Sequence, residues 1–438
     1  MTRRGTGARA GSAAAALAAL LLVVAACRPT PVAPAPATAG DTAAVYLHDD
    51  ERIGEARQIW DGVLKPDRAV ATFRNTHRLF PTRIVSPAAQ PRPLPEGPAL
   101  TPPAITHDGR AFTFEELLEA NRIAGLLVLK DGAVVLERYR YGNTPQTRWM
   151  SMSVAKSVLA TLTGAALHDG RLASLDEPIT RFVPVLQGSA YDGVTFEHLL
   201  KMASGVSFNE AYTDRTSDRR RMLELQIAQR RGSIMGLMAS LPRVAEPGTR
   251  VQYSTGETQV LAEALRGVVG MPLATYLEQR VWQPAGMEAP ALWWLDAPDG
   301  TEIGGSGLNA TLRDYGRFGQ FILEDGVAGE TRVLPEGWSR RMGRTHGMLE
   351  GTDIPYGLLW WPPTTPLAMA HGAFTAEGIH GQFIHIDPVA RVVIVQWGAR
   401  SKPQGGETVP DADVFDAIVE AAERLATSAT TAPGAPGR

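Results

Sequence analysis

Hydrophobic residues recur at helical spacing immediately after Ser153. Val154, Val158, Leu162 and Ala165 return every three or four residues, and this period predicts a helix with one buried face. The same period predicts further helices at residues 114–123, 195–202, 258–268 and 411–427.

Short apolar runs rich in β-branched residues lie towards both ends of the same region. The runs 125–130 and 133–139 flank Asp131-Gly132, a strong hairpin signal. Strand patterns return after Tyr356 at residues 358–361, 383–386 and 391–397. Between these two sets, residues 171–350 are mostly helical and rich in loops. We therefore predict an α+β fold, in which an antiparallel sheet from both ends of the region is flanked by helices and carries a large, mostly helical insertion.

The N-terminus has the pattern of an export signal. A basic leader precedes the apolar stretch 13–26, which is too short for a comfortable membrane span. The stretch ends in Val24-Ala25-Ala26-Cys27, which resembles a bacterial lipobox. We expect residues 1–26 to be a lipoprotein signal peptide and Cys27 to carry a lipid that anchors the exported protein to a membrane. An ordinary export signal with an incidental cysteine is the alternative.

Composition divides the rest of the chain. Residues 27–45 are rich in Pro and Ala and predict an unfolded tether, whereas residues 46–111 predict an N-terminal wrap. The main domain is expected at 112–428, followed by a disordered tail at 429–438. Cys27 is the only cysteine, so a disulfide within the chain is excluded.

The net charge of the chain limits the classes of partner that we expect. The 438 residues carry a formal net charge of −3. This balance argues against nucleic acid or an anionic membrane surface as the main partner.

The predicted helix after Ser153 brings two reactive side chains onto one face. Ser153 and Lys156 form the only Ser-x-x-Lys in the chain, and residues three apart are neighbours on a helix. A serine at a helix start also lies beside unpaired backbone N–H groups, which can bind an oxyanion. So short a motif also arises by chance, so it needs support from other parts of the chain.

A Ser–Lys pair usually needs a third group to pass the proton on. A hydroxyl is a poor nucleophile until a base takes its proton, and lysine does this only when its pKa is lowered. Tyr253 lies in the polar turn before the 258–268 helix. Spacing alone would make Tyr253 an ordinary core or surface tyrosine.

The order of several motifs resembles the serine β-lactamase and penicillin-binding-protein superfamily. The chain is most similar to its class C side, and there to the 6-aminohexanoate-dimer hydrolases and related carboxylesterases. The resemblance covers roughly residues 112 to 425. Its carriers are Ser153–Ser157, Thr195–Val206, Pro247-Gly248, Tyr253-Ser254, Gly307–Thr311 with Asp314, and Gly378–Gln382 with Asp387-Pro388.

The resemblance implies a role for each matching residue. Ser153 would be the acylated nucleophile, Lys156 its general base, and Tyr253 the group that relays the proton to the leaving group. The backbone amides of Ser153 and Ile379 would form the oxyanion hole, with Ile379 on the strand that opens the second hairpin. Tyr212 would contact the substrate.

The departures from the family pattern change the expected substrate. The Tyr-x-Asn of class C enzymes appears as Tyr253-Ser254-Thr255, and Lys-Thr-Gly is replaced by Ala376-Glu377-Gly378. Without that lysine, no cation is expected to pair with the carboxylate of a β-lactam or D-Ala peptide. We therefore expect esters or linear amides as substrates.

Other candidate features are weaker. His380 adjoins the expected oxyanion donor and is a candidate for contacting substrate, whereas His371 and His385 are expected to be structural. No histidine spacing resembles a zinc site, and we expect no metal and no cofactor. The tryptophan pairs at 293–294 and 360–361 can line an acyl pocket, although one ring of each pair is expected in the core.

The arginine-rich segment 209–231 allows two interpretations. It has few apolar anchors, which fits a solvated loop and helix. A lid over a cleft is the alternative.

Three functions remain open at this stage. The first is an exported, lipid-anchored serine hydrolase acting on small esters or linear amides. The second keeps the fold but acts as a D-Ala carboxypeptidase or β-lactamase. The third is a catalytically silent envelope protein that binds a ligand or partner.

Overall fold

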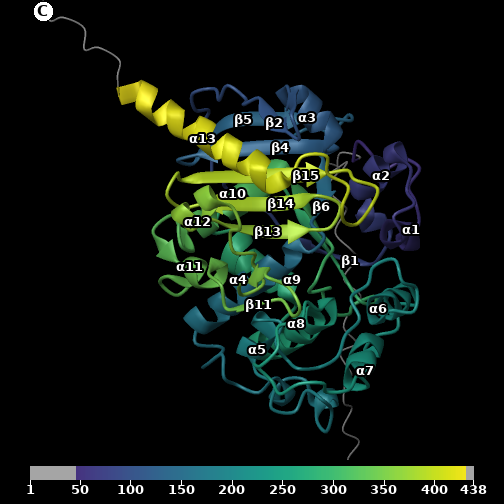
Figure 1. Cartoon of the computed structure of the whole chain (residues 1–438). Coiled ribbons are helices and arrows are strands. Elements are labelled where there is room, and N and C mark those ends of the chain that lie inside the picture. The colour runs from purple at the N-terminus through teal and green to yellow at the C-terminus, as the bar shows by residue number, and fades with distance from the viewer. Residues whose placement is uncertain (1–45, 431–438) are drawn as a thin grey trace, which may run out of the picture. The chain divides into compact units, whose positions relative to one another are not determined.

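The computed structural model describes residues 46–430, with side chains as far as residue 425. At its centre lies a five-stranded antiparallel sheet built from both ends of this region, as Figure 1 shows. The strand order is β13-β14-β15-β4-β5, so the predicted α+β architecture is confirmed. The strands are β4 (Ile123–Lys130), β5 (Ala133–Tyr139), β13 (Phe374–Gly378), β14 (Gln382–Asp387) and β15 (Val392–Gly398).

The apolar strand β4 is buried on both faces. Leu126 and Val128 belong to one hydrophobic core, whereas Leu127 and Leu129 belong to the other. Because both faces are covered, the strand is a continuous apolar run without polar alternation. The covering helices are α3 (Phe114–Ala120) and α13 (Asp411–Thr430) on one face, with α4 (Val154–His168) and α10 (Leu312–Leu323) on the other.

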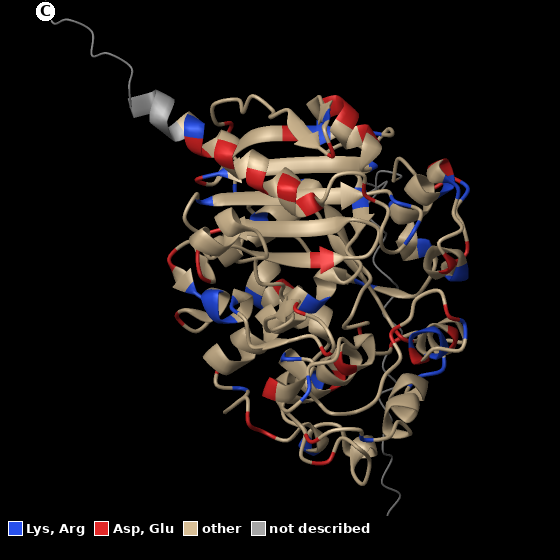
Figure 2. Cartoon of the chain, in the orientation of Figure 1, with Lys and Arg blue, Asp and Glu red and all other residues tan. Residues whose placement is uncertain are grey.

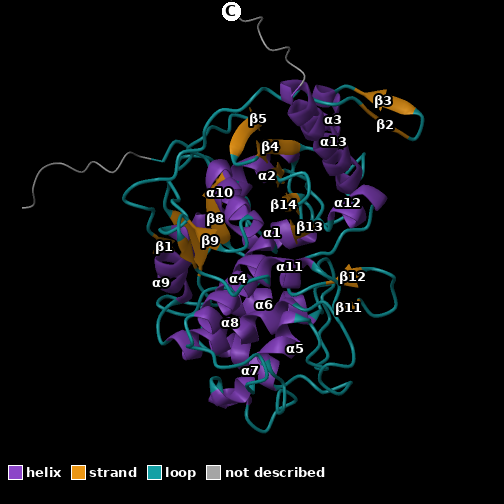
Figure 3. Cartoon of the chain, turned by 90° about the vertical axis from the view of Figure 1, so that its left-hand side faces the viewer, coloured by secondary structure: helices purple, strands orange, loops and turns teal. Residues whose placement is uncertain are grey.

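The insertion between the two halves of the sheet is mostly helical, as predicted. Figure 3 shows α4 to α8 gathered below the five-stranded sheet, and α8 packs against α4. The insertion and the segments after it contain α5 (Phe196–Leu200), α6 (Asp218–Ile227), α7 (Ser233–Ala239), α8 (Thr255–Val269), α9 (Leu273–Leu277), α11 (Trp338–Gly343) and α12 (Pro366–His371). Shorter turns are η2 (Ile179–Arg181), η3 (Pro184–Leu186) and the π-helical η4 (Glu278–Trp282).

A second, four-stranded sheet has the order β1-β7-β8-β6. Its last strand leads into α4. Its members are β1 (Thr82–Val85), β6 (Arg148–Met150), β7 (Ala291–Trp294) and β8 (Leu308–Thr311). Two-stranded ladders join β2 (Ile105–His107) to β3 (Arg110–Phe112), β9 (Val327–Ala328) to β10 (Thr331–Arg332), and β11 (Gly347–Met348) to β12 (Pro355–Tyr356).

The segment before the main domain is built into the fold. Its β1 pairs with β7, and the buried Trp60 and Phe73 belong to the same core as α4. The segment contains α1 (Ala56–Asp61), α2 (Pro66–Phe73) and the 3₁₀ turn η1 (Thr76–Arg78). It therefore supplies core side chains as well as surface cover.

Several element boundaries differ from the prediction. Residues 358–361 form no strand, because Leu359 has a φ of +57° that bends the chain, and Trp361 makes an isolated bridge to Thr375. The helix predicted at 114–123 is α3, which ends at Ala120 because Arg122, with a φ of +53°, turns the chain into β4. The hydrophobic pattern did not predict β13, although the resemblance placed a strand at Ile379. The helix α13 runs to Thr430, two residues into the predicted tail.

The predicted signal peptide, Cys27 and the tether lie outside the described residues. Within the described part, no single helix is long and apolar enough to cross a membrane; α8 followed by 273–282 qualifies only as a pair bent by 70°. Figure 2 shows acidic residues along the outward side of α13. Its apolar residues, such as Val414 and Ile418, are buried, which agrees with the amphipathic helix predicted there.

Candidate active site

Ser153 lies where β6 turns into α4. The preceding residue, Met152, has a φ of +41°, in a region that residues with a Cβ rarely adopt. Its side chain is buried, so packing holds this turn in place. Ser153 consequently occupies the N-cap position of α4, where the helix dipole favours developing negative charge.

Lys156 is buried one helical turn further along α4, with 2% of its surface exposed. Its Nζ donates hydrogen bonds to Ser153 Oγ at 2.9 Å, Thr255 Oγ1 at 3.1 Å and the Gly305 carbonyl at 3.0 Å. Burial lowers the pKa of Lys156 to about 7; the charge of Glu210 opposes this shift and that of Arg219 supports it. A lysine with such a pKa can accept a proton near neutrality.

Thr255 connects the lysine to a carboxylate. Its hydroxyl accepts from Lys156 and donates to Glu210 Oε1 at 2.5 Å. Its backbone N–H donates to Glu210 Oε2 at 2.7 Å, so both carboxylate oxygens are engaged at the first residue of α8. Glu210 is partly buried, and a charge withdrawn from water in this way is tolerated when it is hydrogen-bonded.

Tyr253 lies beside the Ser–Lys pair. Its ring centroid is 5.1 Å from Lys156 Nζ, and Trp361 stacks on it at 5.7 Å while Tyr356 meets it edge-on at 5.9 Å. Burial and the charge of Glu210 raise the pKa of Tyr253 strongly, and a hydrogen bond with Ser153 opposes the shift. The phenol is therefore protonated at neutral pH and available as a proton donor.

The end of β13 lies against the start of α4. A Cβ on Gly378 would come within 2.6 Å of the Ser151 carbonyl and 3.0 Å of the Ser153 nitrogen. Glycine is required for this approach, which brings the next residue, Ile379, beside Ser153. Ile379 follows the last residue of β13 and lies in the turn to β14, one position beyond the strand on which it was expected.

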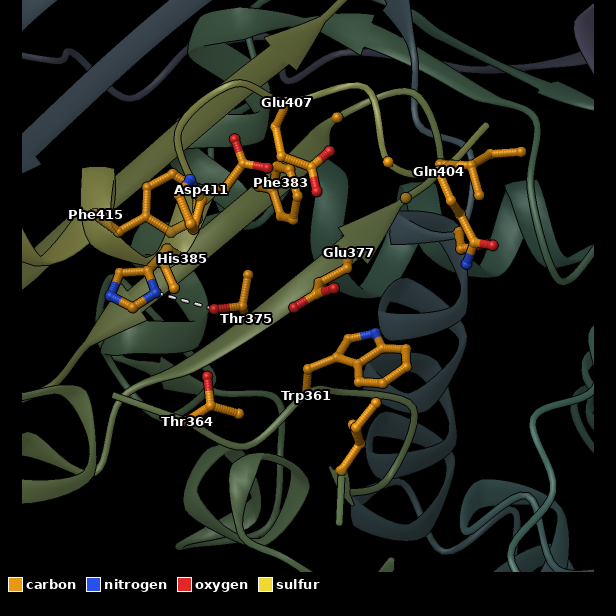
Figure 4. Close-up of a pocket in the computed structure, with 18 of the residues that line it drawn as sticks. Trp361, Thr364, Thr375, Glu377, Phe383, His385, Gln404, Glu407, Asp411 and Phe415 are labelled. Atoms are coloured by element: carbon orange, nitrogen blue, oxygen red, sulfur yellow. Dashed lines mark hydrogen bonds between the residues drawn. The ribbon is translucent and has the colours of Figure 1, made fainter. Parts of the chain in front are cut away.

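Ser153 opens into a cleft of about 820 Å³. Tyr212, Tyr253 and Ile379 line this cleft, so the structure brings them to the same space as Ser153. The cleft continues along β13 towards α12 and α13, and Figure 4 shows this far part. The arrangement offers a hydroxyl, a base, an acid and backbone amides to one small molecule.

Comparison with known proteins agrees with this geometry. The model of the family "Beta-lactamase" matches residues 112–417. The chain belongs to the β-lactamase family. It is 29% identical over 351 residues to the 6-aminohexanoate-dimer hydrolase of Paenarthrobacter ureafaciens, which covers 76% of this chain and 85% of that protein.

Solved structures show the same fold. A Bacillus anthracis protein named as a candidate 6-aminohexanoate-dimer hydrolase superposes with a TM-score of 0.72 at 23% identity, over 82% of this chain and 95% of that chain. A family VIII carboxylesterase gives a TM-score of 0.54 at 17% identity, over 68% of this chain and 91% of that chain. Together with the family match, these findings make the chain a serine hydrolase of the β-lactamase family.

His380 is placed differently from its prediction. Its side chain is fully buried, its ring lies 4.9 Å from that of Phe73, and its Nδ1 hydrogen-bonds to the Arg400 carbonyl. Burial lowers the pKa of His380 to about 4, so the ring is neutral. The φ of +69° at His380 turns the chain here, and its neighbours Ile379 and Gly381 line the cleft in its place.

The remaining aromatic candidates divide between core and cleft. Trp293, Trp294 and Trp360 are fully buried, whereas Trp361 lines the cleft. One ring of the second pair is therefore in the core, as expected, but both rings of the first pair are there. Among the described residues, no group of His, Cys, Asp and Glu side chains is arranged to hold a metal ion.

The arginine-rich segment is solvated only in part, since Arg221, Arg230 and Arg231 are exposed. Arg219 and Arg220 on α6 are buried, and the guanidinium of Arg219 lies 4.7 Å from the ring of Trp60. Residues 210–212, which precede α6, line the cleft. This segment of the β-lactamase-family fold is thus a wall of the cleft.

Three contributors were not assigned a role from the sequence. Thr255 stands where the class C pattern has asparagine, and that correspondence was the available signal for it. Glu210 lies two residues before Tyr212, which was predicted to contact the substrate, but it belongs to no recognised motif. Gly305 holds Lys156 through its carbonyl, and a Cβ there would approach Nζ to 3.1 Å.

Proposed function

We propose that this protein hydrolyses carboxylic esters or linear amides through an acyl-enzyme on Ser153. The observation that carries the proposal is the 2.9 Å hydrogen bond between buried Lys156 and Ser153. Because the pKa of this lysine is lowered to about 7, its neutral amine can take the serine proton without a metal or second base.

The proton path follows from the neighbours of Ser153. Lys156 takes the proton from Ser153 Oγ as that oxygen attacks the substrate carbonyl. The negative carbonyl oxygen of the intermediate is held by the backbone amides of Ser153 and Ile379. Tyr253 gives its proton to the leaving group and recovers one from the Lys156 ammonium. Water then attacks the acyl-enzyme, and the same groups act in reverse.

Labelling with a fluorophosphonate tests the nucleophile. Mass spectrometry should find the adduct on Ser153, and Ser153→Ala should abolish both the adduct and ester hydrolysis. Ser157→Ala is the matched control, because that hydroxyl is on the same helix but donates to the Leu359 carbonyl in the core. A folded sample that cleaves esters while Ser153 stays unmodified would overturn the proposal.

A substrate panel separates this function from its alternatives. We expect turnover of short p-nitrophenyl esters or of 6-aminohexanoate dimer, the substrate in the name of the relative from Paenarthrobacter ureafaciens. Saturable hydrolysis of nitrocefin or of a D-Ala-D-Ala peptide would favour the carboxypeptidase or β-lactamase alternative. If Ser153→Ala left every measured activity unchanged, a silent binding protein would be favoured.

Export and lipid attachment at Cys27 stay predictions from the sequence. They are supported by the basic leader, by the apolar stretch before Cys27, and by the absence of any other cysteine from the sequence. On this proposal the hydrolase acts outside the cytoplasm, held at a membrane surface by its N-terminus.

A further inference from the structure

Glu377 lies in the catalytic cleft without a partner. It is the fourth residue of β13, where it pairs in register with Phe383 of β14. Figure 4 shows its carboxyl group pointing into the open space between Thr375 and Trp361. No hydrogen bond or ion pair to the Glu377 carboxyl is found among the described residues.

The other carboxylates that line the cleft are all engaged. Glu210 accepts from Thr255, Asp416 accepts from Thr365 at 3.0 Å, and Asp411 and Glu407 both pair with Arg400. Glu377 is thus the exception in the described part of the cleft wall.

The cleft offers Glu377 no cation of its own. Among the described residues that line it, Arg400 is the only Lys or Arg. Both Nη atoms of Arg400 are taken by Asp411, at 2.8 and 2.5 Å, and Nη1 also contacts Glu407 at 3.3 Å. Lys156 is committed to the Ser153 site. The charges facing the far part of the cleft therefore favour a positive ligand.

Leaving this carboxyl unpaired has an energetic cost. Burial, together with the charge of Asp411 from α13, raises the pKa of Glu377 to about 8. A group held away from its preferred ionised state regains that state when a cation binds next to it. Such an arrangement is expected at binding sites, whereas a purely structural carboxylate would carry a partner.

The surroundings of Glu377 suit an ammonium group. Trp361 lines the cleft beside it, and an indole face attracts cations. Glu377 precedes Ile379 by two residues, which is about 7 Å along an extended strand. A cation a few bonds from the reacting carbonyl can therefore reach the carboxylate.

We propose that Glu377 is a specificity-determining residue that selects esters or amides bearing an ammonium group. The proposal rests on the hydrolase function proposed above and names its substrate class. Ala376-Glu377-Gly378 stands in place of the Lys-Thr-Gly of penicillin-recognising enzymes, so the segment has lost a cation and gained a carboxylate.

Pairs of charged and neutral isosteric esters test the proposal. Butyrylcholine and 3,3-dimethylbutyl butyrate place the difference on the alcohol side; p-nitrophenyl 6-aminohexanoate and p-nitrophenyl heptanoate place it on the acyl side. At pH 8.5 the wild type should prefer the charged member of at least one pair by about tenfold or more in kcat/KM, the effect of one close charge pair. Glu377→Gln should reduce this preference to about twofold or less while neutral esters are still cleaved.

Asp416→Asn is the matched control, since it removes another carboxylate of the same cleft wall. It should keep the charge preference; equal losses in both variants would assign the preference to the whole cleft and overturn the role of Glu377. Equal rates within both pairs for the wild type would overturn it as well. Failure to cleave any ester, with Ser153 unlabelled, would instead contradict the proposed function.

An inhibition measurement needs no variant. Choline should inhibit hydrolysis of a neutral ester by the wild type more strongly than 3,3-dimethylbutan-1-ol, which has the same shape without the charge. Equal inhibition by the two compounds, combined with equal rates in both ester pairs, would exclude a cation site at Glu377.

Discussion

The two ends of the cleft are built in different ways. At the reacting end, Ser153 and Lys156 come from one turn of α4, and short hydrogen bonds fix their positions. At the far end, the wall is assembled from separated segments, namely residues 210–212, 349–355, 361–365 and 403–416, together with β13. The Ser–Lys pair itself is determined locally, whereas its partners Thr255 and Gly305 and the far wall depend on how distant segments pack.

This difference separates chemistry from selectivity. The reacting end holds the groups that the proposed acyl transfer uses, and it agrees with the motifs that identify the family. The far end has the acidic Glu377 within Ala376-Glu377-Gly378, the segment where the family pattern has Lys-Thr-Gly. We expect substitutions at the first end to remove activity and those at the second to change which substrate is used.

The largest effect is expected from Lys156→Met, at the reacting end. The substitution keeps the length of the side chain but removes the base, so kcat/KM for esters should fall by about a thousandfold or more. Steady-state kinetics on a folded sample measures this. Lys201→Met is the control, because Lys201 pairs with Glu197 at 2.6 Å, outside the cleft, and its activity should remain within about twofold of the wild type.

A loss below about tenfold for Lys156→Met would mean that another group takes the proton from Ser153. The Ser–Lys pair would then not be sufficient to activate the nucleophile.

The pH profile gives an effect of intermediate size. On the proposed mechanism Lys156 acts as a base only when neutral, and its pKa is lowered to about 7 by burial, with Glu210 opposing and Arg219 supporting the shift. Activity on a neutral ester should therefore rise with pH, by about tenfold between pH 6 and pH 8. The pH profile of kcat/KM measures this pKa in the free enzyme. A midpoint near the ordinary lysine value would contradict this role.

The smallest effect is expected at the far end, from the N-terminal segment. Asp61 accepts from Arg220 at 2.6 Å and from Arg215 at 2.8 Å, and Arg220 also donates to the Tyr212 carbonyl at 3.1 Å. Asp61→Asn should loosen this wall, raising KM by about threefold to tenfold with little change in kcat. It should also destabilise the fold by about 1–3 kcal/mol, because buried Arg220 loses its charged partner.

Glu224→Gln is the matched control for Asp61→Asn. It removes the exposed Arg57–Glu224 pair between the same two segments, and exposed pairs contribute little. A larger change in KM from Glu224→Gln than from Asp61→Asn would show that the Tyr212 wall is held in some other way.

Much of the fold could be predicted from the sequence because its signals are local. The Asp131-Gly132 hairpin and the apolar strands β4 and β15 follow from turn chemistry and from continuous hydrophobic runs. The strand β13 was missed because Thr375 and Glu377 face the cleft and break the apolar pattern that a buried strand would show. Residues 358–361 looked like a strand because they are apolar, but the positive φ at Leu359 cannot be read from composition.

The site could be predicted only as far as its motifs extend. Ser153 and Lys156 were paired by helix spacing, Tyr253 and Ile379 were placed by resemblance, and the structure brings the four together. Glu210 was missed because its partner, Thr255, is 45 residues away in sequence. His380 was misplaced because sequence adjacency to Ile379 says nothing about which face a residue in a tight turn will take.

The contacts of Lys156 also fix where its hydrogens are. The Gly305 carbonyl can only accept, and Thr255 gives its own hydrogen to Glu210, so both must receive an N–H from Lys156. A neutral amine has two N–H groups, and both are then used. Its lone pair is left facing Ser153 Oγ, and after proton transfer the third N–H points to the same oxygen. On the proposed mechanism the base is therefore oriented before substrate arrives, and the amine keeps its three partners while it takes the proton from Ser153.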